Sequence, residues 1–372
     1  MKKIHVTKCG SFLVVFLSLL LLNGCKPSTP INANLESVSI TTPEMIKQME
    51  EAVKNEKEIV SYGLPDDWAN WKESWEQFTR KYNLVHHDTD MSSAEEIQKF
   101  KAERNNPKAD VGDIGIQFAP IAVSEGVTMP YKNSYWNEIP NWAKHPDGHW
   151  VAWYTGTMSI AVNKNLVPNI PRTFKDLLKP EYKGKIAFGD PRQAANANWA
   201  IFAANFAMGG DETNVQPGLD FFRKLAESGN LIPVEPSAAN IEKGEAPIVI
   251  NWDFLTLAQR DRLKDKIPLE VIIPEDGTVI GAYVSIINKW APHPNAAKLW
   301  QEFVFSDQGQ INLAKGYARP IRKVDLPPDV AAKLLPESAY KSARAITDWD
   351  AFEKSAKKIA EEWSKIIQLM GR

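Results

Sequence analysis

The stretch Trp150-Val-Ala-Trp-Tyr-Thr-Gly-Thr-Met-Ser-Ile-Ala-Val-Asn163 is a long apolar run of the kind that forms an extended strand. Gly156 interrupts the run near its middle, and a glycine permits a backbone bend that a side chain would oppose. We therefore expect a long strand that is broken at Gly156 and serves as a hinge between two parts of the chain.

On both sides of this run the chain alternates between strands and helices, a pattern typical of an α/β fold with a largely parallel sheet. The expected strands are 58–63, 84–87, 109–116, 185–189, 247–251, 269–273 and 282–288. Helices are expected to begin at Thr42-Pro43, at Pro65 to carry Trp68, Trp71 and Trp75, at the capping box of Ser92 or Ser93, and at Asp190-Pro191 to run through Ala207. Further helices are expected at 218–228, at 295–304 and, with an amphipathic face, at the end of the chain.

The first twenty-five residues indicate export. Lys2-Lys3 precede an apolar run of eleven residues, Phe12–Leu22, which is typical of a secretory signal and short of the roughly twenty residues of a membrane span. Leu22-Asn23-Gly24-Cys25 resembles a bacterial lipobox, which implies cleavage before Cys25 and lipid on its thiol and amine. The alternative is an ordinary cleaved signal beside a coincidental cysteine. Residues 26–40 are polar and are expected to form a tether.

Composition narrows the function further. Removal of the signal with its three lysines leaves 41 basic against 46 acidic side chains, a net charge of −5, which argues against nucleic acid as a partner. Cys9 lies in the signal and Cys25 is the expected lipid site, so the body of the protein is expected to hold together without a disulfide.

The sequence lacks the common enzyme signatures. It contains no G-x-S-x-G, G-x-G-x-x-G, Walker, H-E-x-x-H or C-x-x-C motif. His86 and His87 are adjacent in an expected strand and therefore point to opposite faces, while His145 and His149 flank a turn. We expect no catalysis, no cofactor and no metal site.

Four segments, taken in order along the chain, together resemble the type II solute-binding proteins of bacterial ABC importers. They are Lys108–Val111, Trp153–Lys164, Pro171–Ile186, and the region from Ile287–Lys289 through Asn295–Lys298 to Phe303–Gln308. Within that family the chain is most similar to the branch that binds ferric iron, aminophosphonates, phosphate esters and polyamines.

The resemblance implies a two-lobed type II periplasmic-binding-protein fold, of α/β class, with crossover strands and an interlobe cleft. Lobe 1 would hold 57–153 and 275–316, and lobe 2 would hold 158–270, with the C-terminal helices of 320–372 packed across it. Residues 1–24 would be the signal, and 25–40 the lipidated cysteine and tether. The partners would be a small solute and a membrane permease. The protein would be a monomer, held to a membrane by its lipid alone and facing the periplasm or the cell surface.

In lobe 2, the expected helix start at Asp190-Pro191 is a candidate anion site. Free amides and partial positive charge at a helix N-terminus attract acids, and Arg192 can make a two-pronged contact with phosphate. Gln193 and Asn196 are expected on the same side. The alternative is a capped helix with a solvated arginine. Trp252 is expected to form a flat wall and Asp253 to accept from a solute amine or to hold Arg192, and the alternative is a core tryptophan beside a capping aspartate.

The first lobe and the hinge contribute the remaining candidates. Trp68 follows a strand and is a better cleft residue than Trp71 or Trp75, which are expected in the core. The other candidates are Asp67, for which a helix cap is the alternative, and Gln117, Tyr154, Thr155 and Tyr283.

These residues predict a receptor that captures a small anionic or zwitterionic solute. One alternative is a polyamine receptor that uses tryptophans with Asp66, Asp67, Asp113 and Asp253. Another is a ferric-iron receptor, although this chain has Trp252 and Asp253 where those relatives have a pair of tyrosines. The third, from another class, is an exported hydrolase.

Overall fold

The structure is a computed structural model that describes residues 38–370 apart from 67 and 193. Its strands are β1 (Glu58–Tyr62), β2 (Val85–Thr89), β3 (Val111–Gly115), β4 (Val151–Asn163), β5 (Ile186–Ala187), β6 (Leu231–Ile232), β7 (Ile248–Trp252), β8 (Leu269–Ile272), β9 (Thr278–Ile287), β10 (Arg319–Pro320) and β11 (Ala343–Ala345). Its α-helices are α1 (Pro43–Ala52), α2 (Trp71–Tyr82), α3 (Ser93–Ala102), α4 (Ala119–Ser124), α5 (Ala195–Ala207), α6 (Gln216–Glu227), α7 (Ala238–Lys243), α8 (Asp253–Leu263), α9 (Pro294–Phe305), α10 (Asp307–Lys315), α11 (Pro328–Ala331) and α12 (Trp349–Ile367).

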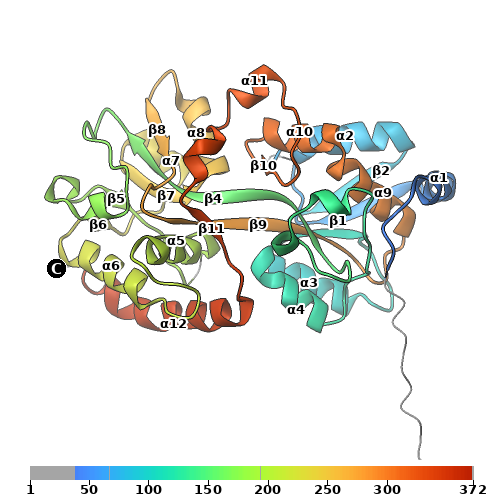
Figure 1. The fold of residues 1–372 in the computed structure, drawn as a ribbon, viewed down its shortest axis with the longest axis horizontal. Coiled ribbons are helices and arrows are strands. Elements are labelled where there is room, and N and C mark those ends of the chain that lie inside the picture. Colours follow the sequence, from blue (N-terminus) through green and yellow to red (C-terminus); the bar gives the residue numbers. More distant parts are fainter. Residues whose placement is uncertain (1–37, 67, 193, 371–372) are drawn as a thin grey trace, which may run out of the picture. The chain divides into compact units, whose positions relative to one another are not determined.

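The strands pair in the order β2-β1-β3-β9-β4-β7-β5-β6. β1 is parallel to β2 and β3, and β5 is parallel to β6 and β7, whereas β9 and β4 run antiparallel to their neighbours along this path. Two parallel groups are therefore joined by a pair of antiparallel strands, and this confirms the predicted α/β class with crossover strands (Figure 1).

The crossover strands β4 and β9 each belong to both groups. The first half of β4 pairs with β9, and its second half pairs with β7 and β8. We call β1–β3 with α1–α4, α9 and α10 lobe 1, and β5–β8 with α5–α8 and α12 lobe 2. Because β4 and β9 pass from one lobe to the other, the residues in their middles lie at the junction of the lobes.

Strand β4 is not broken at Gly156, and this corrects the prediction. It continues through Gly156, and the irregularity in its pairing with β9 falls between Ala152 and Tyr154. Gly156 is needed for space instead, because a Cβ there would lie 2.6 Å from Cε1 of Phe254.

Two helices begin later than the sequence predicts. α2 starts at Trp71 because Ala69 and Asn70 adopt left-handed backbone angles, φ 48° and 60°, which a helix cannot contain. α5 starts at Ala195, not at Asp190-Pro191. Other starts are confirmed: the side chain of Thr42 caps α1, and Ser92 and Glu95 form the capping box of α3.

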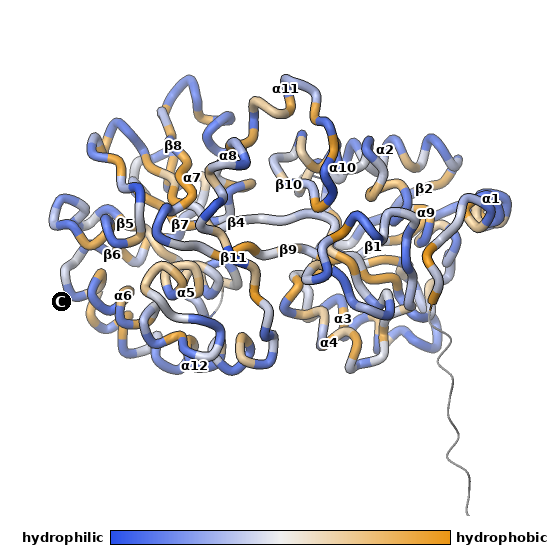
Figure 2. The backbone as a smooth tube through the Cα atoms, in the orientation of Figure 1, coloured by the Kyte–Doolittle hydropathy of each residue, from blue (hydrophilic) through white to orange (hydrophobic). Residues whose placement is uncertain are grey.

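Apolar faces pack the lobes together. Phe352, Ile359, Trp363 and Ile366 make up the buried face of α12, and Figure 2 shows hydrophobic and hydrophilic stretches alternating along this helix. Trp71 and Trp75 are in the core, as predicted, and Trp75 stacks on Trp300 with ring centroids 3.4 Å apart. Among the described residues, no helix combines the length and the apolar character that a membrane crossing requires.

Candidate functional site

A small cavity lies where the two lobes and a crossover strand meet. Lobe 1 contributes Gly115 and Gln117, lobe 2 contributes Trp199 and Trp252, and β9 contributes Ala282 and Tyr283. Its volume is about 10 Å³, roughly the space of one water molecule. A solute of several heavy atoms can enter only if the lobes move apart, and the two crossover strands are the connection about which they can hinge.

Two glycines that face each other make room for the floor of this cavity. Gly156 of β4 pairs with Gly281 of β9. A Cβ on Gly281 would lie 2.4 Å from Cη2 of Trp252, and one on Gly156 would lie 3.1 Å from Cε3 of the same ring. Trp252 therefore lies against bare backbone, and its position depends on the absence of two side chains.

Aromatic rings form a continuous path across the junction. Trp68 of lobe 1 meets Phe254 of lobe 2 edge to face with ring centroids 5.4 Å apart, and it meets Tyr283 at 5.5 Å. Tyr283 stacks on Tyr154 at 5.4 Å, and Trp252 contacts Trp199 at 5.5 Å. Such pairs contribute about 0.5–1.5 kcal/mol each beyond the area they bury.

A hydrogen-bonded chain leads from the junction into lobe 1. Trp68 Nε1 donates to the Tyr154 hydroxyl at 2.5 Å, and that hydroxyl donates to Asp113 Oδ2 at 3.1 Å. Trp153 Nε1 donates to Asp113 Oδ1 at 2.9 Å. Burial raises the pKa of the Asp113 carboxyl well above its usual range, because two neutral donors only partly replace the lost water. The same burial, together with the charge of Asp113, raises the pKa of Tyr154.

Asp253 is a structural anchor in this structure. It is the first residue of α8 and only 2% exposed. Its Oδ1 accepts the backbone N–H groups of Thr157 and Phe254, and its Oδ2 accepts the Tyr340 hydroxyl at 2.7 Å. Burial raises its pKa, whereas these three donors and the charge of Arg319 oppose that rise. The predicted contact with Arg192 does not occur, because both oxygens of Asp253 already have other donors.

The predicted anion site at Asp190 is arranged differently from the expectation. Asp190 does not cap α5: it accepts the Arg192 amide through Oδ1 and the Ala194 amide through its carbonyl, so those amides are not free. Its carboxylate also pairs with the Arg192 guanidinium, whose Nη1 donates to Ser364 of α12. The side-chain bond to Arg192 lowers the pKa of Asp190.

Asn196, in the first turn of α5, lies close to the cavity. Its Nδ2 donates to Asn251 Oδ1 at 3.1 Å, and Asn251 directly precedes Trp252. Trp199, one turn further along α5, lines the cavity itself. The N-cap residue Ala194 makes no side-chain hydrogen bond to the helix. The first turn of α5 is therefore left without a side-chain cap beside the cavity.

The structure thus brings Gln117, Trp252 and Tyr283 to the cavity and places Trp68 and Tyr154 directly behind it. Thr155 is buried in β4 opposite Arg319. Asp67, Gln193 and Cys25 lie outside the described residues. Sequence reasoning missed Trp199, Phe254 and Gly281. Trp199 lies three residues after Asn196, a spacing that puts both on one helical face and could have revealed it.

Ser61, His86 and Asp88 also meet in lobe 1, in an order unsuited to hydrolysis. Ser61 Oγ donates to Asp88 Oδ1 at 2.6 Å and lies 2.8 Å from His86 Nε2. The serine is completely buried, and its proton points to the carboxylate and not to the imidazole. Burial lowers the pKa of His86 to about 3. This histidine is therefore a poor general base for a nucleophilic serine.

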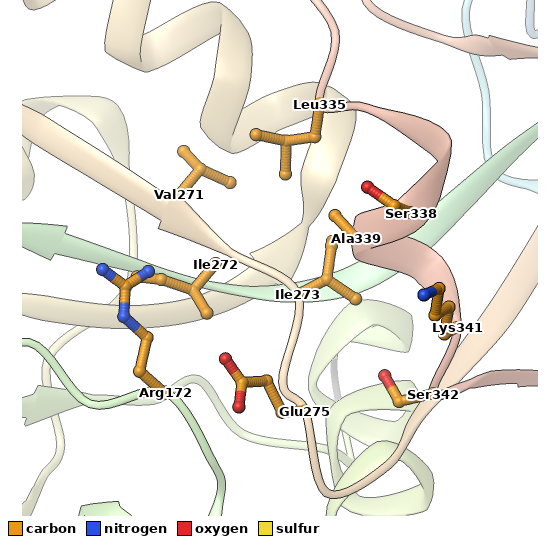
Figure 3. Close-up of a pocket in the computed structure, with 10 residues that line it drawn as sticks. All are labelled: Arg172, Val271, Ile272, Ile273, Glu275, Leu335, Ser338, Ala339, Lys341 and Ser342. Atoms are coloured by element: carbon orange, nitrogen blue, oxygen red, sulfur yellow. The ribbon is translucent and has the colours of Figure 1, made fainter.

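A larger hollow of about 460 Å³ lies elsewhere on lobe 2 (Figure 3). Its walls are Arg172, β8 with the two following segments around Ile273 and Glu275, and the stretch from Leu335 to Ser342. Figure 3 shows Arg172 and Glu275 on one side and Lys341 on the other. No lobe 1 element lines it, so hinge motion cannot close it around a solute. Among the described residues there is also no group of three or more His, Cys, Asp or Glu able to hold a metal ion.

Two lobes, two crossover strands and a cavity lined from both lobes define a type II periplasmic solute-binding protein. The chain belongs to the bacterial extracellular solute-binding protein family, whose model matches residues 106–355.

Individual relatives agree with this assignment. A probable ABC transporter periplasmic-binding protein of Sinorhizobium fredii is 25% identical over 278 residues, which are 72% of this chain and 74% of the relative. A putative 2-aminoethylphosphonate-binding periplasmic protein of Salmonella typhimurium is 23% identical over 328 residues, 82% of this chain and 90% of the relative. The periplasmic binding protein AfuA of Actinobacillus pleuropneumoniae, solved with fructose-6-phosphate bound, has the same fold with a TM-score of 0.65 and 23% identity, covering 84% of this chain and 98% of that one.

Proposed function

We propose that this protein is the receptor of a bacterial ABC importer and that it captures a small zwitterionic or anionic solute, such as an aminophosphonate or a phosphate ester. The observation that carries the proposal is the cavity at the junction, because its walls come from both lobes and from a crossover strand. A solute held there would contact both lobes at once and would stabilise one relative position of them, the change that a permease can recognise.

The first turn of α5 is the proposed binding site for the acidic group. Unpaired amides and the helix dipole favour an anion at a helix N-terminus, and here Asn196 and Asn251 add side-chain amides beside it. The names of two similar proteins support this chemistry, since 2-aminoethylphosphonate and fructose-6-phosphate both carry a phosphorus oxyacid.

Arg192 would join this site only by exchanging Asp190 for the solute. The ion pair is partly exposed, so the exchange costs little. If the exchange occurs, Arg192→Ala should weaken solute binding at least tenfold, since a charged hydrogen bond contributes roughly 1.5–3 kcal/mol. Unchanged affinity in titration calorimetry would remove Arg192 from the site while leaving α5 in it.

Native mass spectrometry of freshly purified protein tests the proposal as a whole, because a tightly held solute adds its own mass. A thermal-shift panel of 2-aminoethylphosphonate, glycerol 3-phosphate and spermidine then identifies the class. A true ligand at 100 times its dissociation constant stabilises the folded state by about 2.7 kcal/mol. A protein that carries no solute and responds to none of the panel would contradict the proposed substrate class.

A polyamine receptor is the second candidate. No basic side chain lines the cavity, and aromatic rings make up three of its six lining residues. This lining suits a diamine through cation–π contacts better than it suits a simple anion. Stabilisation by spermidine and not by either phosphorus compound would favour this candidate.

The remaining features of the proposal concern export and architecture. Cys25 is proposed to carry lipid, residues 26–40 to act as a tether, and the body to work as a monomer without catalysis. The proposed domain limits are those expected from the sequence, 57–153 with 275–316 and 158–270. Replacement Cys25→Ser should move the protein from the membrane fraction to the soluble fraction of cells, and retention in the membrane would contradict the lipid anchor.

A further inference from the structure

We infer that the lobe 1 side of the cleft binds a positively charged amine, which packs against the ring of Tyr283 and is attracted by the buried carboxyl of Asp113 behind it. The inference rests on the proposed receptor function and names the chemical group that this half of the cleft recognises. A primary ammonium group of a zwitterion and one of a diamine would both satisfy it.

The first observation is the arrangement of rings. Tyr283 lines the cavity, stacks on Tyr154 with an angle of 15° between the rings, and is met edge-on by Trp68. Trp252 and Trp199 line the cavity from lobe 2. The face of an aromatic ring attracts a cation by roughly 0.5–2 kcal/mol, and more so where water is excluded. The cavity thus offers several ring surfaces and no positive side chain.

The second observation is uncompensated negative charge beneath those rings. Asp88, Glu96 and Asp113 lie in lobe 1, and the latter two are 1% and 4% exposed. None of the three forms an ion pair with a Lys or Arg of the described residues. Glu96 Oε2 is buried without any hydrogen-bond partner among those residues. Burial, then the charges of Asp113 and Asp88, raises the pKa of Glu96.

Tyr283 connects the two observations. Burial raises its pKa, and the charges of Asp113 and Glu96 raise it further, so the field of both carboxyls reaches the ring that lines the cavity. The hydrogen bonds from Trp68 through Tyr154 to Asp113 fix the direction of that field. A buried carboxyl without a cation is costly, and an arriving ammonium group offsets that cost where a neutral or anionic group cannot.

Titration calorimetry with three probes tests the inference. They are 2-aminoethylphosphonate, ethylphosphonate, which lacks the amine, and putrescine, which lacks the acid. We expect an amine-bearing probe to bind at least tenfold more tightly than ethylphosphonate. Asp113→Asn should remove that preference, because it keeps the shape and loses the charge. The exposed Asp265→Asn serves as the charge-matched control and should keep it.

A second pair of variants covers the case in which Asp113→Asn does not fold. Tyr283→Phe keeps the ring and should retain the preference for the amine, whereas Tyr283→Leu should abolish it. Because Asp113 acts through Tyr154 and the field at Tyr283, it is a positioning residue, and the ratio of the two phosphonate affinities is the readout that a purely structural role would not move.

The outcomes separate the inference from the proposed function. Equal affinity for the two phosphonates overturns the amine site and leaves the receptor proposal standing. Binding of putrescine alone supports the amine site and replaces the acidic solute with a diamine. Failure of both amine-bearing probes to bind overturns the inference, and the solute retained in native mass spectrometry then still tests the receptor.

Discussion

Asp253 Oδ1 accepts the backbone N–H of Thr157 at 2.8 Å, which ties the first residue of α8 to crossover strand β4. The other oxygen of the same carboxylate accepts the Tyr340 hydroxyl from the segment before β11. One buried side chain therefore joins lobe 2, the crossover and the C-terminal segment, directly beside the residues that line the cavity.

Replacement Asp253→Ala should destabilise the protein by about 1.5–3 kcal/mol, since it leaves buried donors without a charged acceptor. Tyr340→Phe removes only one of these bonds and should cost about 1 kcal/mol. Urea denaturation followed by tryptophan fluorescence measures both values. If Asp253→Ala proves as stable as the unmodified protein, the carboxylate is not the anchor that its contacts indicate.

Replacement Gly281→Ala should displace Trp252, because the new Cβ would lie 2.4 Å from the indole. Overpacking of this kind costs roughly 1–3 kcal/mol, and solute affinity should fall with it. In a double-mutant cycle with Trp252→Leu the cost of the alanine should shrink, since the clashing ring is gone. An alanine penalty that is the same with either residue at 252 would show that the clash is relieved elsewhere.

Replacement Glu96→Gln should make the protein more stable at pH 8 than at pH 5, relative to the unmodified chain. Burial raises the pKa of Glu96 in the folded state, so the native protein keeps a proton that the unfolded chain releases as the pH rises. Stability tied to that proton is present at low pH and is lost as the pH rises above the unfolded pKa. Melting temperatures at both pH values give the difference, and the exposed Glu361→Gln is the control. A pH-independent difference would contradict a raised pKa.

Replacement His86→Gln should reduce the sensitivity of the protein to acid. Burial lowers the pKa of His86 to about 3, so the unfolded chain takes up a proton below about pH 6.5 that the native imidazole, stacked on Trp75, refuses. Stability is therefore lost as the pH falls below that value. Between pH 7 and pH 5 the unmodified protein should lose about 2 kcal/mol more than the variant, as measured by urea denaturation. Equal losses would mean that His86 titrates normally in the folded state.

Much of the fold could be predicted because it depends on local patterns. Alternating apolar runs located the strands, and the hydroxyl of Thr42 and the Ser92–Glu95 pair located helix starts. The errors came where residues distant in the chain compete for the same backbone. Asp190 looks like a helix cap, yet it accepts the amide and guanidinium of Arg192 two residues on, and α5 begins only at Ala195.

The candidate site was predicted less completely than the fold. Trp68, Gln117, Trp252 and Tyr283 were found because each follows a strand or lies on one. Asp253 was assigned to the solute because a carboxylate after a buried strand suggests a ligand. Its actual donors, Thr157 and Tyr340, lie far from it in sequence, and no local pattern indicates them.

The sequence by itself determined the class of this protein, since strand and helix patterns depend on neighbouring residues and are readable without a structure. Its four family-like segments indicated a solute receptor, and the family match confirmed that. Only the tertiary structure decided how the cleft is built. The pairing of Gly156 with Gly281, the meeting of Trp199 and Tyr283 at one cavity, and the buried charge of Asp113 beneath Tyr283 all join segments that are far apart in the chain. Packing places such segments together, and the selectivity of the cleft depends on that packing.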